Sequence, residues 1–282
     1  MCALALAAPS LTARGEALFR LDAGALYDSN VSGARGNDVR ADWAGNFAGS
    51  AGWFAAPTEA DSLTLSVDLG HDTYARYHGL NRIAVGGTAI YGHKFGLGLT
   101  APRVFVSVSA SNENYRTDIR DRNRVVVSAA LEKRHNETFD AGVGAFYDRS
   151  YAKNDRPVVP GISGKVFDLQ GHGGYISGGY AISERLFLGA KVAVRRGDIV
   201  STSQREQHVF VASDAIAVDA TFGDQLYDYR LPGTTLTIGA TVSFALTDHS
   251  SLNASYIDES TRAPEGLNYR SHGANVSFAY RY

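Results

Sequence analysis

The sequence ANVSFAYRY, residues 274–282, alternates apolar and polar side chains up to its last residue. One face carries Val276, Phe278, Tyr280 and Tyr282. The other face carries Asn275, Ser277, Ala279 and Arg281. Such alternation indicates a β-strand, because successive side chains of a strand point to opposite faces. Chain termini usually fray, so a final large aromatic residue needs apolar surroundings.

The same alternation recurs about twelve times along the chain. In RVFVSVSA, residues 103–110, the valines face one way and the serines the other. Each segment is near the ten residues that a tilted strand needs to cross a bilayer. The predicted strands are 16–28, 40–54, 62–77, 82–94, 102–116, 123–134, 138–151, 164–181, 185–199, 235–247, 251–261 and 268–282.

The connections between these segments also alternate in length. Those after the even-numbered strands are short, such as HNET at 135–138, and most of the others are longer. The longest connection runs from about 201 to 233. Short turns at one end and long loops at the other are typical of outer-membrane barrels. We therefore predict an all-β fold, a transmembrane up-and-down antiparallel β-barrel of about 12 strands over residues 16–282.

Composition excludes several classes of protein. The chain has 282 residues and a formal net charge of −2, so it lacks the basic excess of a nucleic-acid-binding protein. Its one cysteine, Cys2, excludes a disulfide framework and a cysteine-rich metal site. No spacing matches a metal or cofactor motif, and we predict neither. Residues 1–15 look like a signal-peptide remnant or an N-terminal extension.

Alternation alone fits both a soluble β-sandwich and a membrane barrel, which bury opposite faces. The non-apolar face here is rich in Ser, Gly, Thr and Asn rather than in Lys and Glu, which suits a confined, wet interior. The predicted lumen-lining charged residues are Arg20, Asp22, Asp42, Asp68, Glu132, Asp140, Lys191, Arg195 and Arg281. Their opposed charges either form a ladder that orients a solute or pair and close the pore.

Aromatic residues fall near both ends of the predicted strands, as in the girdles of a lipid-facing wall. One predicted girdle contains Trp53, Phe54, Phe95, Phe139, Phe187, Phe244 and Tyr282. The other contains Tyr27, Trp43, Tyr77, Tyr115, Tyr147 and Tyr256. This pattern favours the barrel. A closed barrel also pairs its last strand with its first, which would give Tyr282 its apolar surroundings.

Two stretches resemble known families. The ending YRSHGANVSFAYRY is similar to the C-terminal insertion signal of Gram-negative outer-membrane proteins, with Tyr in place of the commoner final Phe. The matching positions are His272, Gly273, Val276, Phe278, Tyr280 and Tyr282. The stretch DAGALYDSNVSGA, which contains Tyr27–Asn30, resembles the first strand of the putative β-barrel porin 2 group and of the barrel domain of surface lipoprotein assembly modifiers. The resemblance implies an outer-membrane location and contact with the barrel-assembly machinery.

The long connection 201–233 is too apolar for a freely solvated loop, with Phe210, Ile216 and Phe222 among its apolar residues. Such a segment normally makes a contact. We predict that it either folds into the lumen as a constriction or docks on a partner.

The leading functional hypothesis is an outer-membrane channel of the porin type for small polar solutes. A structural or interaction barrel that anchors or exports a partner protein is the first alternative. An outer-membrane lipid hydrolase is the second, because His71 and His78 lie near an outer rim, but no motif sets a serine beside them. We expect no catalytic residues and contact with outer-membrane lipid. A protein partner at the extracellular loops and a homo-oligomer are left open.

Overall fold

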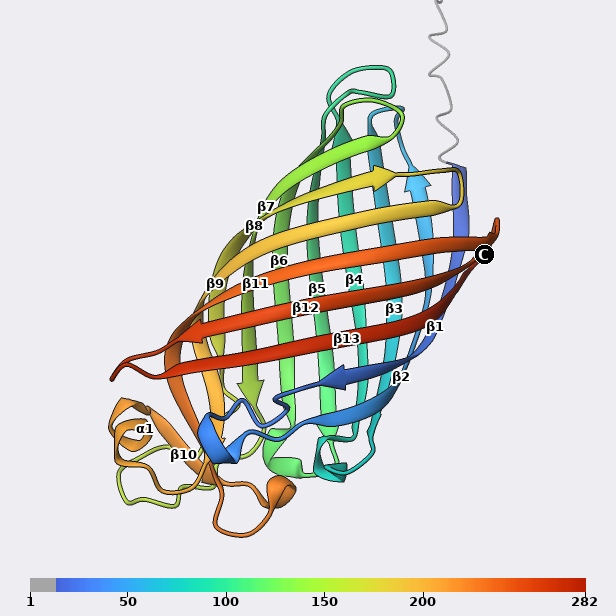
Figure 1. The fold of residues 1–282 in the computed structure, drawn as a ribbon. Helices are drawn as coiled ribbons and strands as arrows, with labels where there is room; N and C mark the ends of the chain where they lie inside the picture. The colour runs from blue at the N-terminus through green and yellow to red at the C-terminus, as the bar shows by residue number, and fades with distance from the viewer. Residues whose placement is uncertain (1–13) are drawn as a thin grey trace, which may run out of the picture.

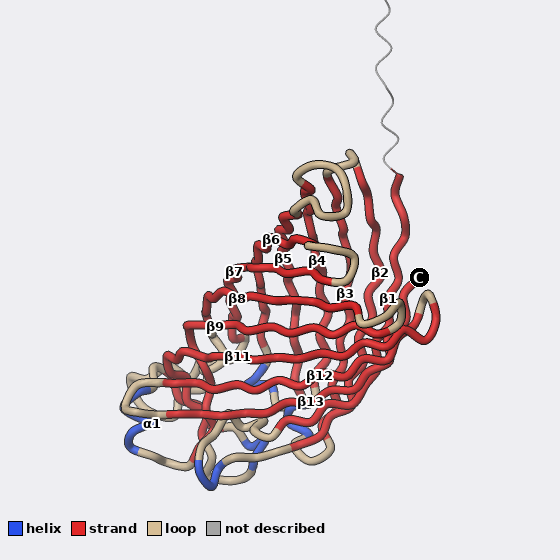
Figure 2. Tube along the Cα trace, turned by 45° about the horizontal axis from the view of Figure 1, so that its top comes forward, coloured by secondary structure: helices blue, strands red, loops and turns tan. Residues whose placement is uncertain are grey.

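The computed structural model describes residues 14–282, in which twelve antiparallel strands form a closed barrel (Figures 1 and 2). Consecutive strands pair, β9 pairs with β11, and β13 pairs with β1. The strands are β1 (Arg14–Asp28), β2 (Asp42–Ala56), β3 (Asp61–Tyr74), β4 (Arg82–Lys94), β5 (Arg103–Tyr115), β6 (Arg122–Arg134), β7 (Phe139–Ala152), β8 (Gln170–Ala181), β9 (Leu186–Ser203), β11 (Tyr227–Thr247), β12 (Ser250–Arg262) and β13 (Asn268–Arg281). The predicted barrel of about twelve strands is confirmed.

The last strand closes the barrel against the first. Arg281 of β13 lies opposite Arg20 of β1, and the Tyr282 amide donates to the Phe19 carbonyl at 2.9 Å. The alternating C-terminal segment is therefore paired on both edges, since β12 lies on its other side. The predicted signal-peptide remnant 1–15 lies outside the described residues, except for Arg14 and Gly15, which begin β1.

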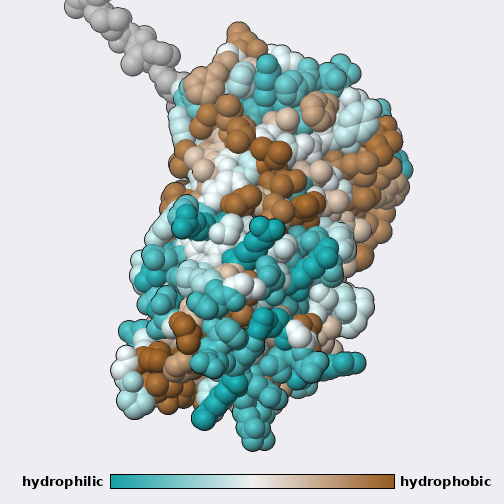
Figure 3. Space-filling view, turned by 60° about the vertical axis from the view of Figure 1, so that its left-hand side comes forward, coloured by the Kyte–Doolittle hydropathy of each residue, from teal (hydrophilic) through white to brown (hydrophobic). Residues whose placement is uncertain are grey.

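The outer wall of the barrel is an apolar belt. Large apolar side chains at every second position are exposed, for example Val67, Ile176 and Val276. Figure 3 shows hydrophobic residues gathered over the barrel wall, whereas the end that carries the long loops is mostly hydrophilic. An exposed apolar surface of this extent indicates contact with lipid. Among residues 14–282, no helix is long and apolar enough to span a membrane.

Several predicted strand boundaries were wrong. The eighth strand begins at Gln170 rather than at 164, because Val166 and Phe167 pack into an apolar cluster among the loops. The ninth and tenth predicted strands are longer than expected, since β9 continues to Ser203 and β11 begins at Tyr227. The third ends at Tyr74 rather than at 77. The remaining predicted boundaries agree to within two residues.

The predicted aromatic girdles were correct in part. Trp43 and Tyr147 are exposed on the outer wall near the long loops, and Trp53 and Phe139 are exposed near the opposite end. Three predicted members instead lie on the inward-facing side of their strands, where each pairs with an inward-facing residue: Phe54, Tyr115 and Phe187.

Candidate channel lumen and its extracellular cap

The inward-facing side of the barrel carries small and charged residues. The structure places all nine predicted lumen residues at inward-facing strand positions, each opposite another inward-facing residue in the register. Ser50, for example, lies between Arg20 on β1 and Asp68 on β3. The apolar side chains of the same strands point outward, so the barrel wall separates lipid from a polar interior.

These nine residues do not form one network. Arg20 pairs with Asp22 on the same strand. Asp68 accepts hydrogen bonds from Ser66 at 3.0 Å and from Thr88 at 2.7 Å. The Lys191 ammonium lies 4.0 Å from the centre of the Tyr175 ring. Glu132, Asp140 and Arg281 make no ion pair within residues 14–282.

Asp42 has a different role from the other eight. Its side chain is buried, and one carboxylate oxygen accepts hydrogen bonds from the backbone amides of Arg76 and Tyr77 at 3.0 and 2.9 Å. The other carboxylate oxygen accepts a hydrogen bond from the amide of Trp43. Asp42 therefore fixes the start of the loop after β3 rather than facing an open path.

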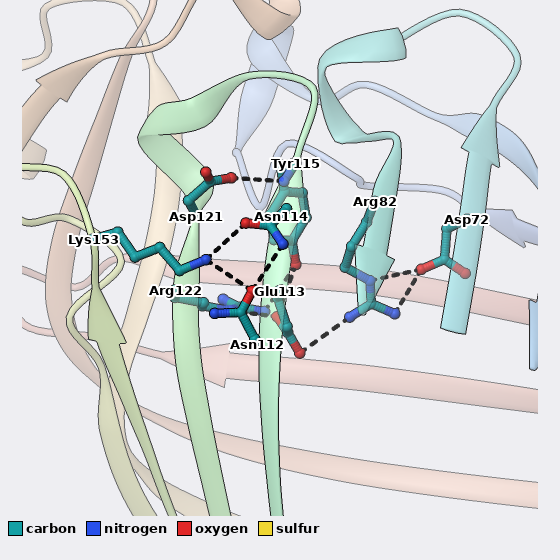
Figure 4. Close-up of polar contacts among 9 residues, drawn as sticks. All are labelled: Asp72, Arg82, Asn112, Glu113, Asn114, Tyr115, Asp121, Arg122 and Lys153. Atoms are coloured by element: carbon teal, nitrogen blue, oxygen red, sulfur yellow. Dashed lines mark hydrogen bonds and ion pairs between the residues drawn. The ribbon is translucent and has the colours of Figure 1, made fainter. Parts of the chain in front are cut away.

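A ladder of alternating charge crosses four neighbouring strands near the long loops (Figure 4). Arg82 on β4 donates to Asp72 on β3 at 2.9 Å and to Glu113 on β5 at 3.3 Å. Arg122 on β6 donates to Glu113 at 2.7 Å and to the Tyr115 hydroxyl at 3.0 Å. A fully paired ladder holds these side chains against the wall rather than across the lumen.

Sequence patterns did not reveal this ladder, although its residues obey the same alternation. Asp72 has the strand parity of Asp68, and Glu113 has that of the inward serines of β5. Arg82 and Arg122 are the first residues of β4 and β6, where a strand is hard to distinguish from a loop. Extending the alternation to the strand ends would have identified all four residues.

On the neighbouring strands β7 to β9, the predicted Arg195 is held by a partner that the sequence did not reveal. Its guanidinium donates to both oxygens of Asp148 on β7, at 2.9 and 2.8 Å, and to the Asp198 carbonyl at 2.9 Å. Such a two-point pair fixes the arginine more firmly than a single contact does.

The long connection folds into a compact unit. Residues 204–226, here called the cap, contain helix α1 (Gln207–Ala212), strand β10 (Ala215–Val218) and the short helix η4 (Ala220–Phe222). Strand β10 pairs with the start of β11, which pairs on its other edge with the end of β9. The outer parts of β9 and β11 therefore form an arm that carries the cap beyond the barrel.

The cap and arm contact all five of the other long loops, so they lie across the loop end of the barrel (Figures 1 and 2). Arg35, in the loop after β1, pairs with Glu206. Leu80, in the loop after β3, packs on Phe222. The remaining contacts are Thr117 with Thr221, Ser163 with Ala215, and Leu267 with Tyr229.

The main buried apolar clusters of the described residues lie at this end. One gathers Val209, Ile216, Tyr229 and Leu231, a second gathers Ile119, Val166 and Phe167, and a third gathers Leu80, Phe222 and Leu226. The structure thus places the predicted Ile216 and Phe222 inside the cap, whereas Phe210 is 41 % exposed. The cap therefore shares its apolar core with the arm and with the neighbouring loops.

A buried charge cluster joins the cap to the loop after β5. The Arg120 guanidinium donates to Asp219 at 2.6 Å and to Asp228 at 3.4 Å. It also lies 4.8 and 5.3 Å from the ring centres of Phe167 and Phe222. The single guanidinium of Arg120 thus contacts two buried carboxyl groups and two aromatic rings.

The pKa values of Asp219 and Asp228 shift in opposite directions in this cluster. The cluster lies outside the lipid-facing segments. Although burial opposes ionisation, the Arg120 guanidinium lowers the pKa of Asp219. Burial and the neighbouring Asp219 raise the pKa of Asp228 to about 8, against the attraction of Arg120. Near neutral pH the cluster therefore holds a proton on Asp228, because one guanidinium cannot balance two buried charges.

The two histidines of the hydrolase hypothesis point away from a common site. His71 bonds to Thr73 at 2.9 Å on the outward-facing side of β3, and His78 bonds to the Tyr74 carbonyl. Neither has a hydrogen bond to a serine side chain within residues 14–282. In the same part of the chain, no group of three or more acidic, His or Cys side chains is placed to hold a metal ion.

Comparison with known proteins identifies the fold. No family model and no curated protein matches the chain, so the resemblance of Tyr27–Asn30 to particular barrel families stays a prediction. An outer-membrane channel from Pseudomonas putida F1 superimposes with a TM-score of 0.55 at 11 % identity, covering 94 % of this chain and 95 % of that one. This likeness is one of fold.

Two other solved structures are less similar. The outer-membrane channel DcaP of Acinetobacter baumannii has a TM-score of 0.47 at 9 % identity and covers 99 % of this chain and 100 % of its own. The NanC porin has a TM-score of 0.48 at 10 % identity, with 92 % and 98 % covered.

Proposed function

We propose that the protein is a channel in the outer membrane of a Gram-negative bacterium, which passes small polar solutes through a lumen whose outer mouth is covered by the cap. One observation carries this proposal: the inward-facing side of a closed barrel bears charged groups that remain accessible to solvent, such as Lys191 and Glu132. A barrel that served only as an anchor would not need an accessible charged interior. The barrel fold shared with an outer-membrane channel supports the proposal.

The test is conductance across a planar bilayer. In one variant, residues 204–226 are replaced by Asn-Gly, which makes a tight turn between Ser203 and Tyr227, two residues that already pair across the arm. We expect the purified protein to conduct ions and the variant to conduct severalfold better. If neither protein conducts, the channel proposal is wrong.

A matched control comes from the opposite end of the barrel. The turn between β4 and β5 contains Leu97, which is highly exposed, and shortening this turn leaves the cap intact. The conductance of the variant with the shortened turn should equal that of the unmodified protein. If both deletions raise conductance equally, the cap is not the closure that we propose.

A second candidate function, docking of a partner protein, is favoured by the outer surface of α1. Val211 and Phe210 are exposed there, next to a pocket of about 500 Å³ that Tyr227 also lines. A photo-crosslinking residue at position 211 should then capture a defined protein in living cells, while the same residue at the exposed position 97 should not. The lipid-hydrolase alternative and self-association stay predictions.

A further inference from the structure

A row of outward-facing polar residues crosses five neighbouring strands at one level of the barrel wall. Each residue of the row lies directly opposite the next one on the neighbouring strand. From β7 to β12, the row consists of Tyr147, His172, Arg196, Thr234 and Arg262. All five side chains share the parity of the exposed apolar residues on their strands. The row therefore faces the surroundings of the barrel and not its lumen.

The row lines a groove of about 580 Å³. The groove exists because β8 begins only at Gln170 and β12 ends at Arg262, whereas β9 and β11 continue into the arm. Asp198 also lines the groove, and its carboxylate is engaged by a hydrogen bond from the Gln170 backbone amide at 2.9 Å. The same level of the wall thus offers both a concave surface and a concentration of basic groups.

The two arginines of the groove have no acidic partner. Within residues 14–282, neither Arg196 nor Arg262 makes a side-chain hydrogen bond or an ion pair, and neither does His172. The nearby Arg270, also outward-facing, is bound to Asp258 at 3.2 Å. The two exposed guanidinium groups lie on either side of Thr234 and repel each other, so an anion between them would stabilise both.

The position of the row relative to the apolar belt indicates which anion fits. Two residues further along the same strands, Val194 on β9 and Leu236 on β11 are exposed on the outer wall. Two residues of a strand span about 7 Å. A molecule that meets both surfaces has an anionic head and hydrocarbon chains a few ångströms below it. Tyr147, exposed beside the groove, has the amphipathic character of side chains at a membrane interface.

We propose that this groove binds the phosphate groups of an outer-leaflet glycolipid, whose acyl chains lie along Val194 and Leu236. Arg196 and Arg262 hold the phosphate between them, because guanidinium groups match phosphate oxygens with paired donors. His172 and Thr234 supply further donors to the sugar-phosphate head. The proposal rests on the outer-membrane location but not on conduction, so its failure leaves the channel proposal untouched.

The test compares ligands that differ only in phosphate or in acyl chains. Purified protein in neutral detergent is titrated with bisphosphorylated lipid A, with the same lipid after removal of its phosphates, and with inorganic phosphate. Binding is followed by native mass spectrometry and by the shift in melting temperature. We expect tight binding of the phosphorylated lipid only. Equal binding of the dephosphorylated lipid overturns the proposal, and saturation by inorganic phosphate at similar concentrations shows a free-anion site instead.

Variants then locate the site. The double variant Arg196→Ser/Arg262→Ser should lose at least about tenfold in affinity for the phosphorylated lipid, since each basic group near a membrane surface contributes to such binding. Arg270→Ser is the matched control, because this residue faces outward but is already paired. Equal losses in the two variants rule out the groove. Should the double variant fail to fold, the comparison of ligands on the unmodified protein still decides the proposal.

Discussion

At the residue scale, the cap depends on how one guanidinium balances two carboxyl groups. Arg120 comes from the loop after β5, Asp219 from the cap, and Asp228 from the arm, so the cluster joins three separate segments. The side chains of Asp219 and Asp228 are fully buried, and the Thr202 hydroxyl donates to Asp228. Buried ionic clusters of this kind are strongly destabilised when one partner changes its charge.

The cluster predicts that the cap loosens as pH rises. Burial raises the pKa of Asp228 from 3.8 to about 8, so the folded cap binds one more proton than the unfolded segment between those values. Its stability therefore decreases as pH rises from about 4 to 8. Hydrogen–deuterium exchange of 207–222, corrected for the intrinsic dependence of exchange on pH, should show less protection at pH 8 than at pH 5.

The variant Asp228→Asn separates this cause from others. It keeps a neutral side chain of similar shape next to Asp219, so the fall in protection between pH 5 and pH 8 should flatten. A variant that retains the full pH dependence would show that another group controls it. Asp118→Asn is a control, because this residue lies beside Arg120 in sequence but pairs with Arg156 in an exposed position.

At the element scale, alternation predicted the barrel strands well and their extracellular extensions poorly. The membrane-crossing part of a strand carries one apolar and one polar face, which the sequence displays directly. In the arm, both faces are covered by protein, so Ser201, Thr202 and Ser203 are buried although they look like loop residues. Conversely, Val166 and Phe167 look like strand residues but contribute to the core of the cap. Only tertiary contacts distinguish these cases.

For the lumen, too, the sequence predicted only part of the arrangement. The parity of each strand predicted which charged residues face inward, because parity follows from the apolar face alone. It did not predict which of them pair, since partners such as Arg195 and Asp148 lie 47 residues apart and meet only across β8. Nor did it locate the ladder of Figure 4, whose members lie at strand ends.

The base of the arm depends on a glycine at a close backbone approach. A β-carbon on Gly197 would lie 2.2 Å from the Gln170 carbonyl oxygen and 2.4 Å from the Gly171 α-carbon. Gly197→Ala must therefore push β8 away from β9. We expect it to lower the free energy of unfolding by about 1–3 kcal/mol, as for other overpacked sites, measured by urea denaturation in lipid vesicles.

The control for this substitution is Gly239→Ala on β11. A β-carbon there would meet its nearest neighbours at 3.8 Å, an ordinary contact distance. Its effect should stay within about 0.5 kcal/mol. If the two substitutions lower the free energy of unfolding equally, the close approach of β8 and β9 at Gly197 does not explain the loss of stability.

At the scale of the whole molecule, the barrel has three surfaces of different chemical character. The apolar belt forms the outer wall, the cap and loops form a folded layer over one end of the barrel, and the lumen carries charge of both signs. Some lumen arginines are neutralised by direct partners, as Arg82 and Arg122 are by Asp72 and Glu113. If the protein conducts ions, its selectivity should therefore depend on the accessible charges that lack a partner rather than on the total number of charges in the lumen.

Lys191 is the accessible cation that best tests this view. It faces the lumen over the Tyr175 ring and makes no ion pair among residues 14–282. Lys191→Gln should shift the reversal potential in a KCl gradient toward greater cation selectivity, because an unscreened positive charge is lost from the conduction path. The double variant Arg195→Gln/Asp148→Asn removes one charge of each sign from a closed pair, so its reversal potential should stay near that of the unmodified protein. A larger shift in the double variant than in Lys191→Gln would mean that paired charges, and not free ones, set the selectivity of this lumen.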